Sequence, residues 1–143
     1  MRSSISAALD RAVGLFDEGG LSSGRRVIDV SGDGANNEGR PVLQARENAV
    51  AKGVIINGLP LMLKKSGYMD DFGLDLYFRV CVIGGQGSSI VRARDKAQLK
   101  EAIKTKIILE VSGIDPSPHP LVQRAQADDC LKGETQWRNR MGN

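Results

Sequence analysis

The sequence predicts an α/β fold with three parallel strands and flanking helices. Aromatic side chains make up only 4% of the 143 residues, so the core must be built from aliphatic side chains, as layered α/β folds allow. The middle of the chain reads as a strand–helix–strand unit of about 30 residues. The first segment has apolar residues at spacings of three and four, which is the period of a helix.

The first predicted helix begins almost at the first residue. Ser3 or Ser4 can cap it, because a serine hydroxyl accepts a hydrogen bond from an unpaired backbone N–H. Gly19 and Gly20 supply its end. Its apolar residues share one helical face: Ile5, Ala8, Leu9, Ala12, Val13 and Phe16.

The strand–helix–strand unit comes next. Residues 25–31 are rich in β-branched side chains and predict a strand, and residues 54–59 predict a second strand that Pro60 closes. The helix between them begins at Pro41 and ends at Gly53. Its inner face is expected to hold Val42, Ala45, Ala49 and Val50. The two strands should be parallel, with a right-handed crossover.

The second half of the chain has a weaker pattern. We expect a loop at 64–73, a short helix at 74–82, a turn at 84–87, a third strand at 88–92 and a long helix at 95–110. Four residues of that helix should face inward: Leu99, Ala102, Ile103 and Ile107.

The composition changes after Ser112. We expect one partial α/β domain at 1–112 and a polar tail at 113–143, disordered or loosely docked, because Pro116, Pro118 and Pro120 forbid regular structure. Three parallel strands make a thin sheet with an open edge, through which the chain is expected to form a homodimer.

Composition limits the partners. The net charge of +3 is spread along the chain without a basic stripe, so we expect no nucleic-acid partner. Without an apolar run of membrane-spanning length or a signal peptide, we expect no membrane partner and a cytoplasmic location. Cys81 and Cys130 are far apart, and the sequence leaves open whether they are bonded or free.

The residues with most chemical promise follow the first strand. Asp33 lies where open α/β sheets bind ligands, and Gly32 and Gly34 permit close approach of the backbone. Asn36 and Asn37 add oxygen donors, and such a set suits Mg²⁺. The alternative is that all five only build the turn, since Asp, Asn and Gly are common turn residues.

No enzyme signature is complete, so we expect no catalytic activity. The dinucleotide pattern G-x-G-x-x-G fails at Asn37, and the only histidine, His119, lies among the prolines of the tail. The alternative function is a small Rossmann-type nucleotide- or phosphate-binding protein, with phosphate at the helix start near Arg40. Asp29, in mid-strand, needs a partner from Arg25, Arg26 or a neighbouring strand, or an edge position facing water.

Residues 26–34 (RVIDVSGDG) and the following Asn36-Asn37-x-Gly39-Arg40 are similar to an uncharacterised bacterial family, the domain of unknown function 1194, in the von Willebrand factor A-like clan. The likeness continues at 53–60, 74–77, 81–85 and 106–110 and covers residues 3–111. It implies a partial doubly wound, Rossmann-like fold that lacks the first strands, and a protein-interaction module.

The resemblance also implies a metal site. Type A domains often hold a divalent cation at a metal-ion-dependent adhesion site (MIDAS), which combines an Asp-x-Ser-x-Ser motif, a threonine and an aspartate. Ser3 matches the threonine and Asp33 the aspartate, but Asp-x-Ser-x-Ser is absent from this chain. We therefore expect an incomplete site, weak Mg²⁺ binding, and an unknown protein partner. Whether full-length relatives are exported stays open.

Overall fold

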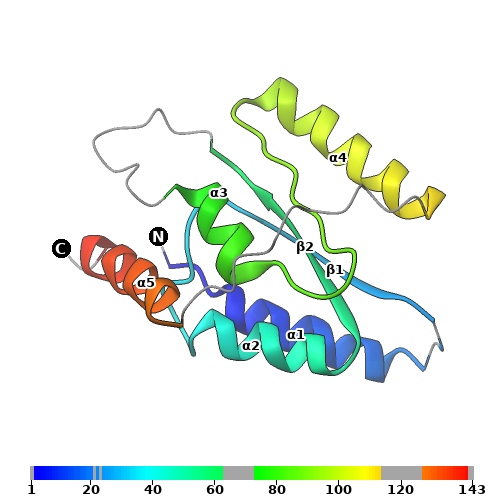
Figure 1. The fold of residues 1–143 in the computed structure, drawn as a ribbon, viewed down its shortest axis with the longest axis horizontal. Coiled ribbons are helices and arrows are strands. Elements are labelled where there is room, and N and C mark those ends of the chain that lie inside the picture. The colour runs from blue at the N-terminus through cyan, green and yellow to red at the C-terminus, as the bar shows by residue number, and fades with distance from the viewer. Residues whose placement is uncertain (1, 21, 23, 63–72, 114–126, 142–143) are drawn as a thin grey trace.

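The computed structural model has a two-stranded parallel sheet with helices on both faces (Figure 1). It describes residues 2–20, 22, 24–62, 73–113 and 127–141. The mixture of helices and parallel strands fits the predicted α/β class. The elements in order are α1 (Ile5–Glu18), β1 (Arg26–Gly32), α2 (Val42–Ala51), β2 (Val54–Pro60), α3 (Leu74–Tyr77), η2 (Phe78–Val82), α4 (Lys96–Ser112) and α5 (Ala127–Met141).

Helix α1 forms as its sequence predicts. The Ser4 hydroxyl accepts a hydrogen bond from the backbone N–H of Ala7 at 3.2 Å, so Ser4 is the N-cap. Ile5, Leu9 and Val13 are buried in the main core, which also contains apolar residues of α2, β2 and η2. The predicted apolar face is therefore the face that packs.

The strand–helix–strand unit is also confirmed. Strands β1 and β2 are parallel, with a register that runs from Arg26 opposite Val54 to Gly32 opposite Pro60. Nearly all of β2 is buried, whereas the residues of β1 are half-buried or exposed. The difference arises because β2 lies beside β1 on one side and residues 88–93 on the other, while no strand pairs with the outer edge of β1 in the described ranges.

The predicted third strand at 88–92 is not formed. Its segment runs parallel to β2 but makes only isolated bridges, Gly58 to Ile90 and Leu61 to Ala93. A continuous strand would need two further bridges between these, at Leu59 and Pro60 of β2. Both of those bridges require a hydrogen bond donated by the backbone N–H of residue 60. That residue is Pro60, which has no N–H, so only its carbonyl takes part, accepting from Ala93 at 3.2 Å.

The short helix predicted at 74–82 is present as α3, which continues into the π-helical turn η2. Gly58 allows η2 to approach the sheet, since a Cβ there would lie 2.9 Å from side-chain atoms of both Phe78 and Ile83. Except for Gly73, the loop predicted at 64–73, with Asp70 and Asp71, lies outside the described residues.

Helix α4 has the predicted length, but one prediction about its faces is wrong. Ala102 is buried and Leu99 half-buried against β2, as expected, whereas Ile103 and Ile107 are exposed. Lys106 is buried in their place, because it forms an ion pair with Asp29 of β1. The helix is rotated so that its lysine, and not its isoleucines, faces the sheet.

The C-terminal part differs from the predicted polar tail. Residues 127–141 form helix α5, and a disulfide joins its Cys130 to Cys81 of η2. Cys130 and Glu134 are buried, so α5 is docked on the main body. The three prolines and His119 lie outside the described residues. In the part of the chain described, no helix is long and apolar enough to cross a membrane.

Candidate functional site

The loop after β1, residues 33–39, is hydrogen-bonded to the first turn of α1. The amide oxygen of Asn36 accepts from the backbone N–H of Ser6 at 3.1 Å and from the Ser6 hydroxyl at 3.3 Å. Its amide nitrogen donates to the carbonyl of Arg40 at 3.0 Å. Asn36 is fully buried, so its donors and acceptors serve the fold and are not directed at a ligand.

Asn37 makes a second connection. The backbone N–H of Ser3 donates to the Asn37 side-chain oxygen at 2.8 Å, and the Asn37 N–H donates to the Ser3 carbonyl at 3.0 Å. Gly39 has φ +83°, and a Cβ there would lie 2.9 Å from the Ser4 hydroxyl oxygen. The structure therefore brings Ser3 next to the predicted ligand loop, through hydrogen bonds that hold the loop on α1.

Asp33 lies just beyond Gly32, the last residue of β1, and is partly buried, as is Gly34. Among the described residues, no group of three or more His, Cys, Asp or Glu side chains could hold a metal ion. A cation at this edge would therefore rely on Asp33, on hydroxyl and amide oxygens, and on water.

The place that the sequence offers to a phosphate is filled by carboxylates of the chain itself. At the start of α2 the N–H of Val42 donates to Glu134 Oε1 at 3.0 Å. Nε of Arg40 donates to Asp10 Oδ2 at 2.9 Å, and this hydrogen bond raises the pKa of Arg40. Both groups that would attract phosphate already have anionic partners.

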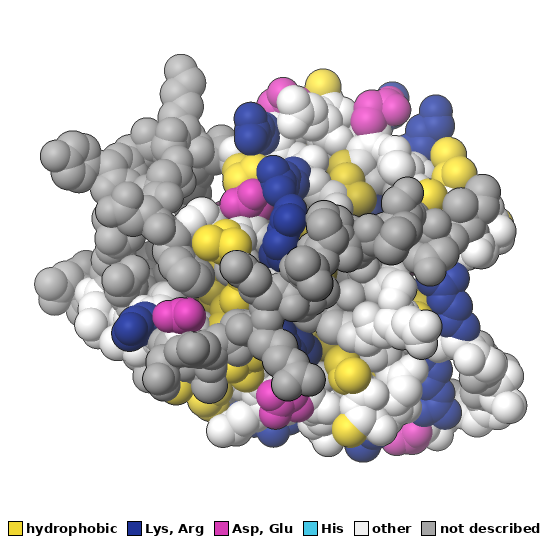
Figure 2. Space-filling model, in the orientation of Figure 1, with side chains coloured by type: hydrophobic (Ala, Val, Ile, Leu, Met, Phe, Trp, Pro, Cys, Tyr) yellow, Lys and Arg dark blue, Asp and Glu magenta, His cyan; other side chains and the backbone are white. Residues whose placement is uncertain are grey.

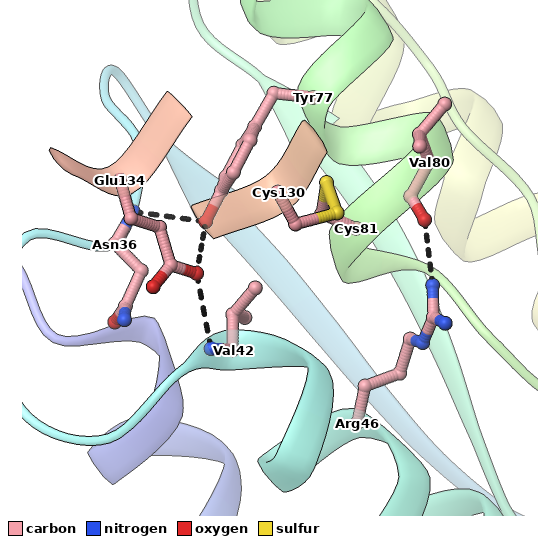
Figure 3. Close-up of a disulfide and its surroundings, with 8 residues drawn as sticks. All are labelled: Asn36, Val42, Arg46, Tyr77, Val80, Cys81, Cys130 and Glu134. Carbon is pink, nitrogen blue, oxygen red and sulfur yellow. Dashed lines mark hydrogen bonds between the residues drawn. A yellow bond between two sulfur atoms is a disulfide. The ribbon is translucent and has the colours of Figure 1, made fainter. Parts of the chain in front are cut away.

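Glu134 belongs to a buried polar cluster beside the disulfide (Figure 3). The Tyr77 hydroxyl donates to Glu134 Oε1 at 3.1 Å and accepts from the Asn36 N–H at 3.2 Å. Burial, and then the negative charge of Glu134, raise the pKa of Tyr77. The cluster joins α5, α3, the start of α2 and the candidate loop. No sequence motif indicates it, because hydrogen-bonded partners such as Val42 and Glu134 are 92 residues apart in the chain.

A second polar cluster lies on the opposite face of the sheet, under α4. Lys106 is ion-paired with Asp29, while Glu110 accepts a hydrogen bond from the Asn57 amide at 3.2 Å. Burial, and then the nearby charge of Asp29, raise the pKa of Glu110. Arg26, one of the predicted partners of Asp29, instead contacts Asp17 and Phe16 of α1.

The cavity at this second cluster is small. It has a volume of about 10 Å³, the room of about one water molecule. Its lining includes Arg25, Asn57, Ser89, Lys106 and Glu110. The cluster therefore fixes α4 on the sheet and does not form a pocket for an organic ligand.

Comparison with known families gives one match. The model of the family described as "Protein of unknown function (DUF1194)" matches residues 1–115. No curated protein and no solved structure matches the chain. The match covers α1 to α4. It therefore includes the residues of both polar clusters except Glu134, and it does not reach Cys130 of the disulfide.

Proposed function

The chain belongs to the DUF1194 family, and on that premise we propose that it is a protein-interaction module of the von Willebrand factor A type and not an enzyme. The observation that carries the proposal is the network joining the loop at 33–39 to the first turn of α1. It holds a preformed surface at the carboxyl end of β1, where open α/β sheets bind ligands. A preformed surface loses little conformational entropy when a partner binds.

The same edge is proposed to keep part of a MIDAS-type metal site, made by Asp33 and Ser3. This is supported by two hydrogen bonds between the backbone of Ser3 and Asn37, which belongs to the loop that contains Asp33. Mg²⁺ would supply an open coordination position for a carboxylate of the partner protein. The nucleotide- or phosphate-binding alternative is weaker, since Glu134 and Asp10 occupy its expected contacts.

A metal titration tests the site. With so few protein ligands, we expect Mg²⁺ to bind in the millimolar range, with NMR shifts confined to residues around Ser3 and Asp33. Asp33→Asn should abolish these shifts, and Asp129→Asn on the exposed side of α5 should leave them unchanged. If millimolar Mg²⁺ and Mn²⁺ cause no NMR shifts around Ser3 or Asp33, the metal is removed from the proposal.

The outer edge of β1 is proposed to pair with a second copy of the chain. Unpaired backbone N–H and C=O groups of an edge strand are a template for another strand. We expect a dimer in light scattering, and the dimer should persist when the exposed Ile107 of α4 is changed to Asp. A monomer at high protein concentration would contradict this assembly.

The disulfide bears on where the module works. Disulfides persist mainly in oxidising compartments and are rare in the cytosol. The bond between Cys81 and Cys130 therefore favours an exported protein over the cytoplasmic location expected from the sequence.

A further inference from the structure

Helix α4 has a second apolar face that points away from the sheet. Ile103, Ile107 and Val111 recur at every fourth residue and so form one row along the helix. Their exposed fractions are 44%, 55% and 84%, and the neighbouring Ile108 is 54% exposed. A contiguous exposed apolar patch, unlike scattered single apolar side chains, marks an interaction surface.

Three lysines lie on the same side of the helix. Lys96, Lys100 and Lys104 also recur at every fourth residue, and each of the last two lies three residues before an isoleucine of the apolar row. All three lysines are exposed. We call this set of apolar and basic side chains the outer face of α4. On the outer face of α4, lysines alternate with aliphatic side chains. A partner that matches this face must therefore offer both negative charge and apolar groups.

The outer face is held in place before any partner binds. Ala102 and Lys106, on the opposite side of α4, are buried against the sheet, and Lys106 is paired with Asp29. Figure 1 shows α4 at the border of the molecule, away from α1, α2 and α5. Figure 2 shows hydrophobic, basic and some acidic side chains together on that part of the surface.

We propose that the outer face of α4 binds the surface of an anionic lipid bilayer, with the helix lying parallel to the membrane plane. The isoleucines and the valine would enter the boundary between headgroups and acyl chains, and the lysine stems would extend to the lipid phosphates. A second copy of the chain fits less well, because it would bring lysine rows of like charge together. A helix that lies on the membrane surface in this way needs no apolar run of membrane-spanning length.

Vesicle co-sedimentation tests the proposal without metal or protein partner. The wild-type chain should bind vesicles of phosphatidylcholine with phosphatidylserine, bind vesicles of phosphatidylcholine alone far less, and lose binding as salt rises. Lys100→Gln with Lys104→Gln should lower the partition coefficient about 25-fold. Ile107→Asp should lower it at least about tenfold.

The matched control is Leu15→Asp on α1, whose side chain is 50% exposed and lies outside the outer face. It should bind like wild type, and circular dichroism should show all variants folded. The proposal is overturned if wild type ignores anionic vesicles or if the α4 variants bind them equally well. It is also overturned if vesicles fail and Ile107→Asp instead abolishes self-association or binding to a soluble acidic helical peptide.

Discussion

Reduction of the Cys81–Cys130 disulfide should lower the free energy of unfolding by about 4 kcal/mol. The bond joins residues 49 apart, and opening a loop of that length returns conformational freedom to the unfolded chain. Both cysteines are fully or almost fully buried, so the reduced thiols would also leave a less well-packed contact between η2 and α5. Urea denaturation with and without dithiothreitol measures the difference.

The double variant Cys81→Ser with Cys130→Ser is the matched control. It should unfold like the reduced wild type and should not respond to dithiothreitol. In the reduced protein α5 loses its covalent link to η2 and is held by noncovalent contacts such as those of Glu134 with Val42 and Tyr77, so hydrogen exchange should rise first in α5. Equal stability of the oxidised and reduced forms would show that α5 contributes little to the fold.

The first half of the fold could be predicted because its signals are local. The spacing of Ile5, Leu9 and Val13 identifies the buried side of α1, and the β-branched run before Gly32 identifies β1. The parallel pairing of β1 and β2 then follows from the helix that connects them.

The errors arise where one distant residue decides the outcome. Periodicity places Ile103 and Ile107 of α4 inward, but burial of the Lys106 stem, paired with Asp29, turns them outward. In the predicted third strand the β-branched pattern is present, and the missing N–H of Pro60 on the neighbouring strand interrupts the ladder. Neither effect is visible in the segment that it changes.

A loop follows β1, as the sequence predicts, and the side chains of Asn36 and Asn37 connect it to α1. Asn36 and Asn37 bind α1, which is the turn-building role that the sequence left as the alternative. The pairing of Cys81 with Cys130, and the contact of Glu134 with α2, could not be predicted, since a helix in a polar segment gives no signal of its docking position. Asp33 and Ser3 remain the residues proposed to bind metal, because Ser3 is hydrogen-bonded to the loop that contains Asp33.

Lys106→Met should lower the free energy of unfolding by about 2 to 3 kcal/mol. The lysine side chain is only 6% exposed, so its removal leaves Asp29 and Glu110 near each other without the cation between them. Breaking a fully buried ion pair costs about 3 to 5 kcal/mol. A smaller loss of about 2 to 3 kcal/mol is expected here because the Asp29 side chain is 43% exposed and screened by water. Urea denaturation at neutral pH measures the loss.

The pH dependence distinguishes this electrostatic loss from a packing defect. Glu110 already has its pKa raised above the ordinary value of 4.5, first by burial and then by Asp29, while Lys106 opposes the shift. A raised pKa stabilises the fold below that ordinary value, and the stabilisation is lost as pH rises through the folded-state pKa. Without Lys106 the pKa should rise further, so Lys106→Met should gain more stability than wild type between neutral pH and pH about 5. Adding Glu110→Gln should remove most of this extra gain, whereas parallel pH profiles of wild type and Lys106→Met would show that the loss comes from packing alone.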